Sequence, residues 1–191
     1  MNVILASQSP RRKELLGLFP IPFEVKVADI DETMDSNAPA ETEVARVSRL
    51  KALAVTCGDD DIVIAADTIV VCDGKILGKP RDAADAKRML RSLSGHTHQV
   101  MTGMTVVRGQ NIISCTEITD VSFRGLSDRE IDAYIATGEP MDKAGSYGIQ
   151  GGAALFCESL HGDYYNVMGL PVCRLFEILR EIAPELMGDL L

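Results

Sequence analysis

Three cations follow a serine-rich turn in the segment ASQSPRRKELL near the start of the sequence. Arg11, Arg12 and Lys13 come directly after a Ser-Pro pair, where a helix is expected to begin. Cations are unfavourable in the first turn of a helix, because its unpaired N–H groups already carry partial positive charge. These N–H groups, the hydroxyls of Ser7 and Ser9 and two guanidinium groups together suit a polyphosphate. The alternative is an ordinary Ser-Pro helix cap followed by solvated basic residues.

Asp67 interrupts the apolar run IVIAADTIVVC, which is typical of a buried strand. Burying an unpaired carboxylate costs free energy, so Asp67 requires a partner, a metal ion or exposure at a cleft. Such a carboxylate is able to ligate a hard divalent cation or to remove a proton from water. The alternative is a strand end or a bulge, where Asp67 pairs with a backbone N–H group.

An acidic segment, DIDE at residues 29–32, offers further carboxylates, and Lys51 and Lys79 offer further cations. Magnesium bound with a nucleotide usually takes one or two protein carboxylates and completes its shell with water and phosphate oxygens. One carboxylate of this segment together with Asp67 would therefore suffice. The alternative is a solvated acidic loop and two surface lysines.

A glycine-rich segment, DKAGSYGIQGG, spans residues 142–152. Repeated glycines let the backbone approach a ligand closely, and the amide of Gln150 offers both a donor and an acceptor to the edge of a base. The segment lacks the spacing of a Walker loop and is a poor match to a Rossmann fingerprint. A tight structural turn is the alternative.

Composition limits the class of protein. The chain has 191 residues, 46% of them hydrophobic and 25% charged, as in ordinary globular proteins, so we expect one folding unit, residues 1–191. The net charge of −9 argues against a protein that coats nucleic acid. Five cysteines without a CxxC pair are expected to be reduced core residues. No apolar run approaches 18 residues, so we expect no membrane partner and a cytosolic location.

Apolar periodicity predicts the elements that position these residues. Strands are expected at residues 2–6, 23–27, 62–72, 75–77, 97–107 and 112–123. Helices are expected at residues 10–20, 43–54, 82–93, 127–138 and 171–186, and residues 145–152 are expected to form a loop. The basic segment then lies between the first strand and the first helix, and Asp67 lies inside the most apolar strand.

Taken together, five segments resemble the Maf family of nucleotide pyrophosphatases: LASQSPRRKELL, ADT, GKP, DKAGSYGIQG and VMGLP. They occur in the family's order and span essentially the whole chain. The resemblance implies a single Maf-like domain with an α/β fold: an elongated mixed β-sheet flanked by helices, with two lobes around a central cleft. This fold is similar to that of the inosine triphosphate pyrophosphatases. A homodimer is also implied.

The resemblance further implies hydrolysis of nucleoside triphosphates between the α and β phosphates, with Mg²⁺ or Mn²⁺ as cofactor. Asp67 matches the family's proposed proton acceptor and, with Glu32, its metal-binding carboxylates. The matching substrate positions are Ser7, Arg12, Lys51 and Lys79.

The positions of Arg11, Thr68 and Gln150 resemble the branch of the family that acts on dTTP and UTP. The branch that acts on 7-methyl-GTP looks different at these positions, with an aromatic residue at the first. Two rival functions stay open: a nucleotide-binding regulator of cell division that does not turn its ligand over, and a hydrolase of modified pyrimidine triphosphates.

Overall fold

The computed structural model describes residues 1–35 and 37–188. Its strands are β1 (Val3–Leu5), β2 (Phe23–Val25), β3 (Ile62–Cys72), β4 (Lys75–Leu77), β5 (Thr97–Arg108), β6 (Asn111–Phe123) and β7 (Cys157–His161). Its α-helices are α1 (Pro10–Leu16), α2 (Ala40–Ala54), α3 (Ala83–Leu93), α4 (Asp128–Ala136), α5 (Tyr164–Met168), α6 (Val172–Ile182) and α7 (Pro184–Met187). Three short 3₁₀ helices, η1 (Glu139–Asp142), η2 (Ala144–Ser146) and η3 (Gly152–Leu155), follow α4.

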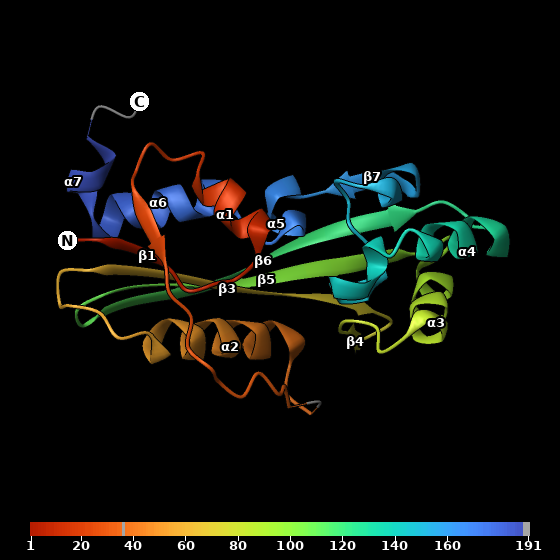
Figure 1. The fold of residues 1–191 in the computed structure, drawn as a ribbon, viewed down its shortest axis with the longest axis horizontal. Coiled ribbons are helices and arrows are strands. Elements are labelled where there is room, and N and C mark those ends of the chain that lie inside the picture. The colour runs from red at the N-terminus through yellow and green to blue at the C-terminus, as the bar shows by residue number, and fades with distance from the viewer. Residues whose placement is uncertain (36, 189–191) are drawn as a thin grey trace. The chain divides into compact units, whose positions relative to one another are not determined.

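The strands of the described residues form one mixed sheet in the order β2-β1-β3-β5-β6-β7, with β4 paired to β3 (Figure 1). β1 runs parallel to both β2 and β3, whereas β4 is antiparallel to β3 and β7 is antiparallel to β6. Packing divides the chain into two compact units. The first unit contains residues 1–67, 102–117 and those after 168, and the second contains residues 68–101 and 118–168. The mixed α/β sheet with flanking helices is as predicted, while the single domain and the central cleft stay predictions.

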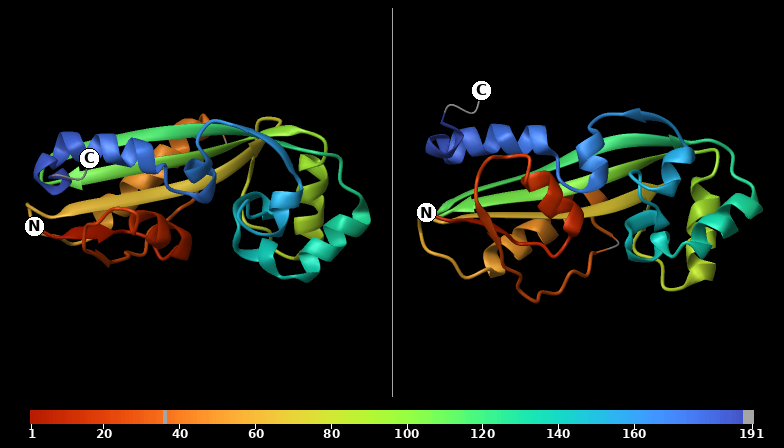
Figure 2. Two further views of the ribbon diagram at one scale, coloured as in Figure 1. Left: turned by 90° about the horizontal axis from the view of Figure 1, so that it is seen from above. Right: turned by 45° about the horizontal axis from the view of Figure 1, so that its top comes forward.

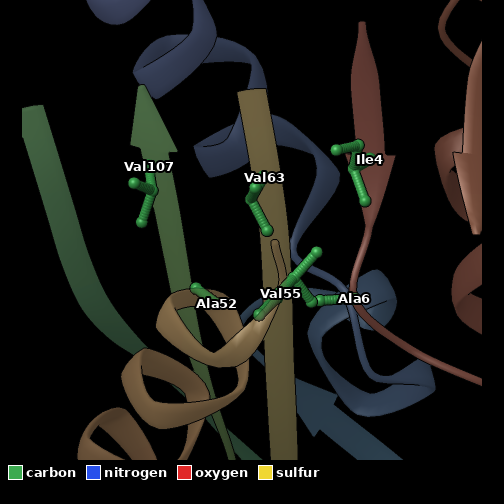
Figure 3. Packing of buried hydrophobic residues seen from close by; sticks show 7 residues of the cluster. Ile4, Ala6, Ala52, Val55, Val63 and Val107 are labelled. Atoms are coloured by element: carbon green, nitrogen blue, oxygen red, sulfur yellow. The ribbon is translucent and has the colours of Figure 1, made fainter. Parts of the chain in front are cut away.

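In the first unit, helices cover both faces of the sheet. Helix α2 lies on one face and α6 on the opposite face, as Figure 1 and the right-hand view of Figure 2 show. The core beneath α2 consists of small and β-branched side chains (Figure 3), namely Ile4, Ala6, Ala52, Val55, Val63, Ala65 and Val107. These residues come from β1, α2, β3 and β5, together with the residues that follow β1 and α2, so α2 is held against three neighbouring strands.

Helix α2 approaches β5 unusually closely at Gly103. A Cβ atom on Gly103 would lie 2.3 Å from the carbonyl oxygen of Val44, which leaves room only for glycine. Hydroxyl groups join the same two elements: Ser48 Oγ lies 2.8 Å from Thr105 Oγ1, which lies 2.9 Å from Ser114 Oγ on β6. The position of α2 is therefore fixed by close contact and by hydrogen bonds as well as by apolar packing.

In the second unit, α3 packs against α4, and a cluster of aromatic rings fills the core. The rings of His98, Phe123 and Tyr147 contact one another edge to face, with centroids 4.8–5.4 Å apart. Phe156 joins them and contacts Tyr134, with centroids 5.2 Å apart. Edge-to-face packing is the favoured geometry for aromatic pairs, so these rings stabilise the unit beyond the burial of their surface.

Local capping signals placed the starts of α1, α3 and α4 correctly. Ser9, Asp82 and Ser127 each cap a helix through a side-chain oxygen, and Ser127 forms the expected capping box with Glu130. Some ends were wrong. α1 ends at Leu16 rather than near residue 20, α2 begins three residues before residue 43, and β2 stops at Val25.

The expected final helix is interrupted at Ala183, where the backbone is non-helical with φ −150° and ψ 61°. The cause is the next residue, Pro184, because proline has no N–H group and disfavours the helical conformation of the residue before it. Two elements, β7 and α5, were not predicted: the burial of β7 does not alternate, and α5 has only 5 residues. The five cysteines are free thiols, but Cys57 and Cys173 are exposed, so the expectation that all lie in the core was wrong.

We predict that Gly103→Ala destabilises the protein by about 3 kcal/mol, because the added methyl group would overlap the backbone of α2. Urea-induced unfolding measures this change in free energy. Gly125→Ala is the matched control, since a Cβ atom there would meet nothing within 4 Å. Equal stability of the two variants would contradict the prediction.

The buried imidazole of His98 predicts a dependence of stability on pH. His98 is 2% exposed, its Nε2 lies 2.8 Å from the hydroxyl of Tyr147, and its Nδ1 has no hydrogen-bond partner among the described residues. Burial lowers the pKa of His98 from 6.5 to about 4. Because the pKa of His98 is lower in the folded than in the unfolded protein, the contribution of neutral His98 to stability is fully present above pH 6.5. This contribution is lost as the pH decreases towards 4.

We expect this loss to amount to about 2 to 3 kcal/mol between pH 7 and pH 4.5. Urea unfolding at several pH values measures it in the wild-type protein and in His98→Phe, which keeps an aromatic ring but cannot be protonated. The difference in stability between the two proteins should shift in favour of the variant at low pH. A difference that does not change with pH would show that His98 is not the group responsible.

Candidate active site

The basic N-terminal segment forms a capped turn that continues from β1. The side chain of Ser9 caps α1 by accepting a hydrogen bond from the N–H of Arg12 at 3.4 Å, and Pro10 occupies the first turn. Ser7 is buried, and its Oγ accepts hydrogen bonds from the N–H of Ser9 at 3.2 Å and from Nη1 of Arg12 at 3.3 Å. The Ser-Pro cap is therefore present, but Arg12 is not a solvated surface residue.

Arg12 is fixed by two other parts of the chain. Besides its contact with Ser7, its Nε donates to the carbonyl oxygen of Gly169 at 2.9 Å. Burial lowers the pKa of Arg12, the negative charge of Asp67 opposes that change, and the positive charge of Arg11 adds to it. Arginine nevertheless stays protonated. The two neighbouring guanidinium groups create a positive potential that favours an anion.

The amphipathic pattern of α2 explains the position of Lys51. Val44, Val47 and Lys51 share one face of the helix, and the two valines are fully buried against the sheet. On β3, side chains alternate between the two faces, so Asp67 continues the row of Val63 and Ala65 that lies beneath α2. The helical period of 3.6 residues and the strand period of 2 residues thus place Lys51 and Asp67 at the same interface, between α2 and the sheet.

Lys51 joins two carboxylates. Its Nζ lies 2.7 Å from Oδ1 of Asp67 and 2.8 Å from Oε2 of Glu32. The side chains of Lys51 and Asp67 are each 14% exposed, whereas that of Glu32 is 56% exposed. Asp67 is thus paired with a side-chain cation rather than with a backbone N–H at a strand end. Because the pair is only partly shielded from solvent, a charged ligand is able to compete for it.

The same two carboxylates fit a divalent cation. Asp67 and Glu32 converge on one cationic atom, and hard oxygen donors are the ligands that magnesium prefers. Among residues 1–35 and 37–188, no group of three or more His, Cys, Asp or Glu side chains is able to hold a metal ion. A cation at Asp67 and Glu32 would therefore need water or ligand oxygens to complete its shell.

The acidic segment is fastened to α2 by Glu43 and Arg46, two residues that no sequence motif indicated. Glu43 accepts from the N–H of Asp35 at 2.8 Å and binds Arg46 through both of its oxygens, at 2.8 and 2.7 Å. Arg46 also donates to the carbonyl oxygen of Thr33 at 2.8 Å. These bonds, chiefly the one from Arg46, lower the pKa of Glu43 to about 2. Glu32, immediately before Thr33, is therefore tethered close to its partner Lys51.

The remaining predicted residues lie in the second unit. Thr68 follows Asp67 on β3 and is half-buried, Lys79 is exposed after β4, and Gln150 is exposed in the glycine-rich segment. The N–H of Gly145 donates to the carbonyl oxygen of Gly78 at 3.0 Å, so the GKP and DKAGSYGIQG segments lie side by side. In the first unit, Arg12 contacts Ser7, and Lys51 contacts Glu32 and Asp67. The two groups are near each other, because the charges of Asp67 and Glu32 raise the pKa of Arg12 against the effect of burial. A common site with Thr68, Lys79 and Gln150 stays a prediction.

Residues 2–182 match the family described as Maf-like protein. The chain belongs to the Maf-like protein family. A dTTP/UTP pyrophosphatase of Bacillus cytotoxicus is 49% identical over 179 residues, which cover 93% of this chain and 94% of that protein. A dTTP/UTP pyrophosphatase of Bacillus mycoides is 47% identical over 185 residues, 96% of this chain and 97% of that protein. The resemblance to the Maf family that the motifs indicated is thus confirmed over residues 2–182.

A solved structure of a HAM1 protein from Coxiella burnetii has the same fold, with a TM-score of 0.50 over 95% of this chain and 99% of that chain. The two sequences are only 14% identical, so this likeness supports the fold alone. Within the described residues, no helix is long and apolar enough to cross a lipid bilayer.

We predict that Glu43→Gln loosens the acidic segment, because an amide cannot bind both Arg46 and the N–H of Asp35 as the carboxylate does. Amide hydrogen exchange at Asp35 should become about tenfold faster. Mass spectrometry of exchanged fragments measures this rate. Glu41→Gln removes the same charge from the same helix turn, where the side chain is exposed, and serves as the control. The prediction is wrong if both variants exchange alike.

Proposed function

We propose that this chain is a pyrophosphatase that hydrolyses dTTP and UTP to the nucleoside monophosphate and pyrophosphate. One observation carries the proposal: in the first unit, Lys51 is shared by Asp67 and Glu32, and the same two carboxylates act electrostatically on the half-buried Arg12. Cations that bind a polyphosphate and carboxylates that activate water are the two requirements of phosphoanhydride hydrolysis. Relatives that are 47–49% identical over nearly their full length are named dTTP/UTP pyrophosphatases, which supports the same substrates here.

In this mechanism the basic side chains bind and orient the triphosphate. Arg12 is held in place by Ser7 and Gly169, so little of its conformational freedom is lost when it binds phosphate. Arg11, Lys51 and Lys79 neutralise the remaining negative charge. Lys51 already lies 2.7 Å from Asp67, so a phosphate oxygen bound to Lys51 would come close to the proposed proton acceptor.

Asp67 orients a water molecule and accepts its proton as the oxygen attacks phosphorus in line. The anhydride bond between the α and β phosphates breaks, and the electron pair of that bond leaves with pyrophosphate. Glu32 and Asp67 would hold Mg²⁺ or Mn²⁺, which supplies Lewis-acid stabilisation of charge on the phosphate oxygens when it is bound. In the second unit, Thr68 and Gln150 contact the pyrimidine.

Two alternatives give different results in experiments. A nucleotide-binding regulator of cell division would bind UTP tightly in calorimetry but release no pyrophosphate. A hydrolase of modified pyrimidine triphosphates would prefer modified uridine or cytidine nucleotides to UTP in a substrate panel. The homodimer and the cytosolic location stay predictions, which sedimentation and cell fractionation would test.

We predict that Asp67→Asn lowers kcat for UTP by about 10²- to 10⁴-fold, because an amide cannot accept the proton of water. The assay measures release of pyrophosphate, separately from phosphate, in the presence of magnesium. Asp60→Asn is the control, since Asp60 is an exposed aspartate outside the site. Near-normal turnover by the Asp67 variant would overturn the mechanism.

A further inference from the structure

The glycine-rich segment around Gln150 is held at both ends by one pair of side chains, Tyr134 and Glu139. The N–H of Gly148 donates to the hydroxyl oxygen of Tyr134 at 3.0 Å, and the N–H of Gly152 donates to Oε2 of Glu139 at 3.1 Å. The Tyr134 hydroxyl in turn donates to Oε1 of Glu139 at 2.9 Å. The pair therefore spans the segment, with Gln150 at its midpoint.

Between these two anchors the backbone forms a tight turn. The N–H of Gly151 donates to the carbonyl oxygen of Gly148 at 3.0 Å, which closes a turn with Ile149 and Gln150 at its centre. Ile149 is buried, whereas Gln150 is exposed. The turn thus uses Ile149 as an apolar anchor and presents the Gln150 side chain on the surface of the second unit.

Side chains of Glu139 and Lys143 lie directly against two glycines of this segment. A Cβ atom on Gly151 would lie 2.1 Å from Oε1 of Glu139, and one on Gly148 would lie 2.8 Å from the side chain of Lys143. The carboxylate of Glu139 therefore lies directly against the backbone of the turn. The glycines were expected to let the backbone approach a ligand. In the structure, Gly151 instead lets the backbone approach a side chain of the same unit.

Tyr134 and Glu139 are themselves well supported. The ring of Tyr134 is buried and packs edge to face on Phe156, and Lys143 Nζ donates to the backbone carbonyl of Glu139 at 2.7 Å. Burial raises the pKa of Tyr134 far above its ordinary value of 10, so the hydroxyl remains a donor throughout the physiological range. Tyr134 and Glu139 are therefore held rigidly, and they hold the turn in place.

We propose that Tyr134 and Glu139 are positioning residues that set the choice of nucleobase by fixing the turn that carries Gln150. The proposal rests on the proposed function. Uracil and thymine present an N–H donor between two carbonyl acceptors, and a glutamine amide is able to pair with one acceptor and the donor at once. Two bonds to one planar edge require the amide to be held at a defined distance, and the pair supplies this constraint.

The test compares Tyr134→Phe and Glu139→Gln with the wild-type enzyme, using UTP and CTP as substrates. Tyr134→Phe keeps the ring but loses the hydroxyl, and we expect KM for UTP to rise about five- to tenfold while kcat changes less than twofold. In the proposed pairing, the amide oxygen of Gln150 lies against the ring N–H and its NH2 group against the carbonyl oxygen that cytosine replaces with an amino group. Cytosine presents an acceptor nitrogen beside an amino donor and makes neither bond in this orientation. KM for CTP should therefore change little, so selectivity for UTP falls by the same factor. Tyr164→Phe is the control, because it removes an exposed hydroxyl from the same unit.

A further comparison separates positioning from a general structural role. In a Gln150→Ala background, Tyr134→Phe should cause no additional loss of selectivity, because the side chain that it positions is absent. Unchanged selectivity in both Tyr134→Phe and Glu139→Gln would overturn the proposal, as would an equal loss with and without Gln150.

Calorimetry with UTP and CTP in an Asp67→Asn background, in which hydrolysis is slow, measures the selectivity as a ratio of Kd values. If the wild-type protein releases no pyrophosphate, the proposed function fails, and the Kd ratios still decide the role of Tyr134 and Glu139. If pyrophosphate is released but neither variant changes the UTP-to-CTP ratio in KM or Kd, the positioning role alone fails.

Discussion

The contact of Lys51 with Asp67 is the interaction on which the first unit depends. Asp67 lies in a strand that is otherwise almost entirely apolar, and an uncompensated carboxylate there would be costly. Its compensating cation comes from the sheet-facing side of α2, at 2.7 Å. The helix must therefore keep both its distance from the sheet and its register along it, or the carboxylate loses its partner. Glu32 shares the same ammonium, so the placement of the acidic segment depends on α2 as well.

The rest of the first unit meets this constraint with polar contacts as well as apolar packing. Gly103 permits the close approach of α2 to β5, and the hydroxyls of Ser48 and Thr105 fix the helix along the strand. Apolar contacts alone would tolerate sliding, because small and β-branched side chains offer similar surfaces at neighbouring positions. A buried hydrogen bond does not tolerate it, since a displaced hydroxyl would lose its partner without gaining water. Glu43 extends the same principle to the loop that carries Glu32.

The sequence predicted what depends on local signals, as the strands β3, β5 and β6 and the three helix caps show. Their signals are apolar runs and capping residues, which act within a few neighbouring positions. β7 was not predicted because its residues carry no alternating pattern. The break in the last helix before Pro184 was not predicted either, although its cause is local. In the site, the periodicity of α2 placed Lys51 among buried valines, but which carboxylate it meets depends on the register of the helix on the sheet.

Two glycines show which structural information cannot be read from a single sequence. Gly103 and Gly151 both lack a side chain because another group needs the space: the backbone of α2 in one case and the carboxylate of Glu139 in the other. A sequence shows that such a position is permissive but not which distant group approaches it. Lys51 and Asp67, which carry the proposed chemistry, belong to the first unit. Tyr134 and Glu139, which are proposed to set the choice of nucleobase, belong to the second unit. The described contacts of the two pairs therefore form separate networks. Substitutions in one network are then able to change base selectivity while leaving the proton acceptor and its lysine in place.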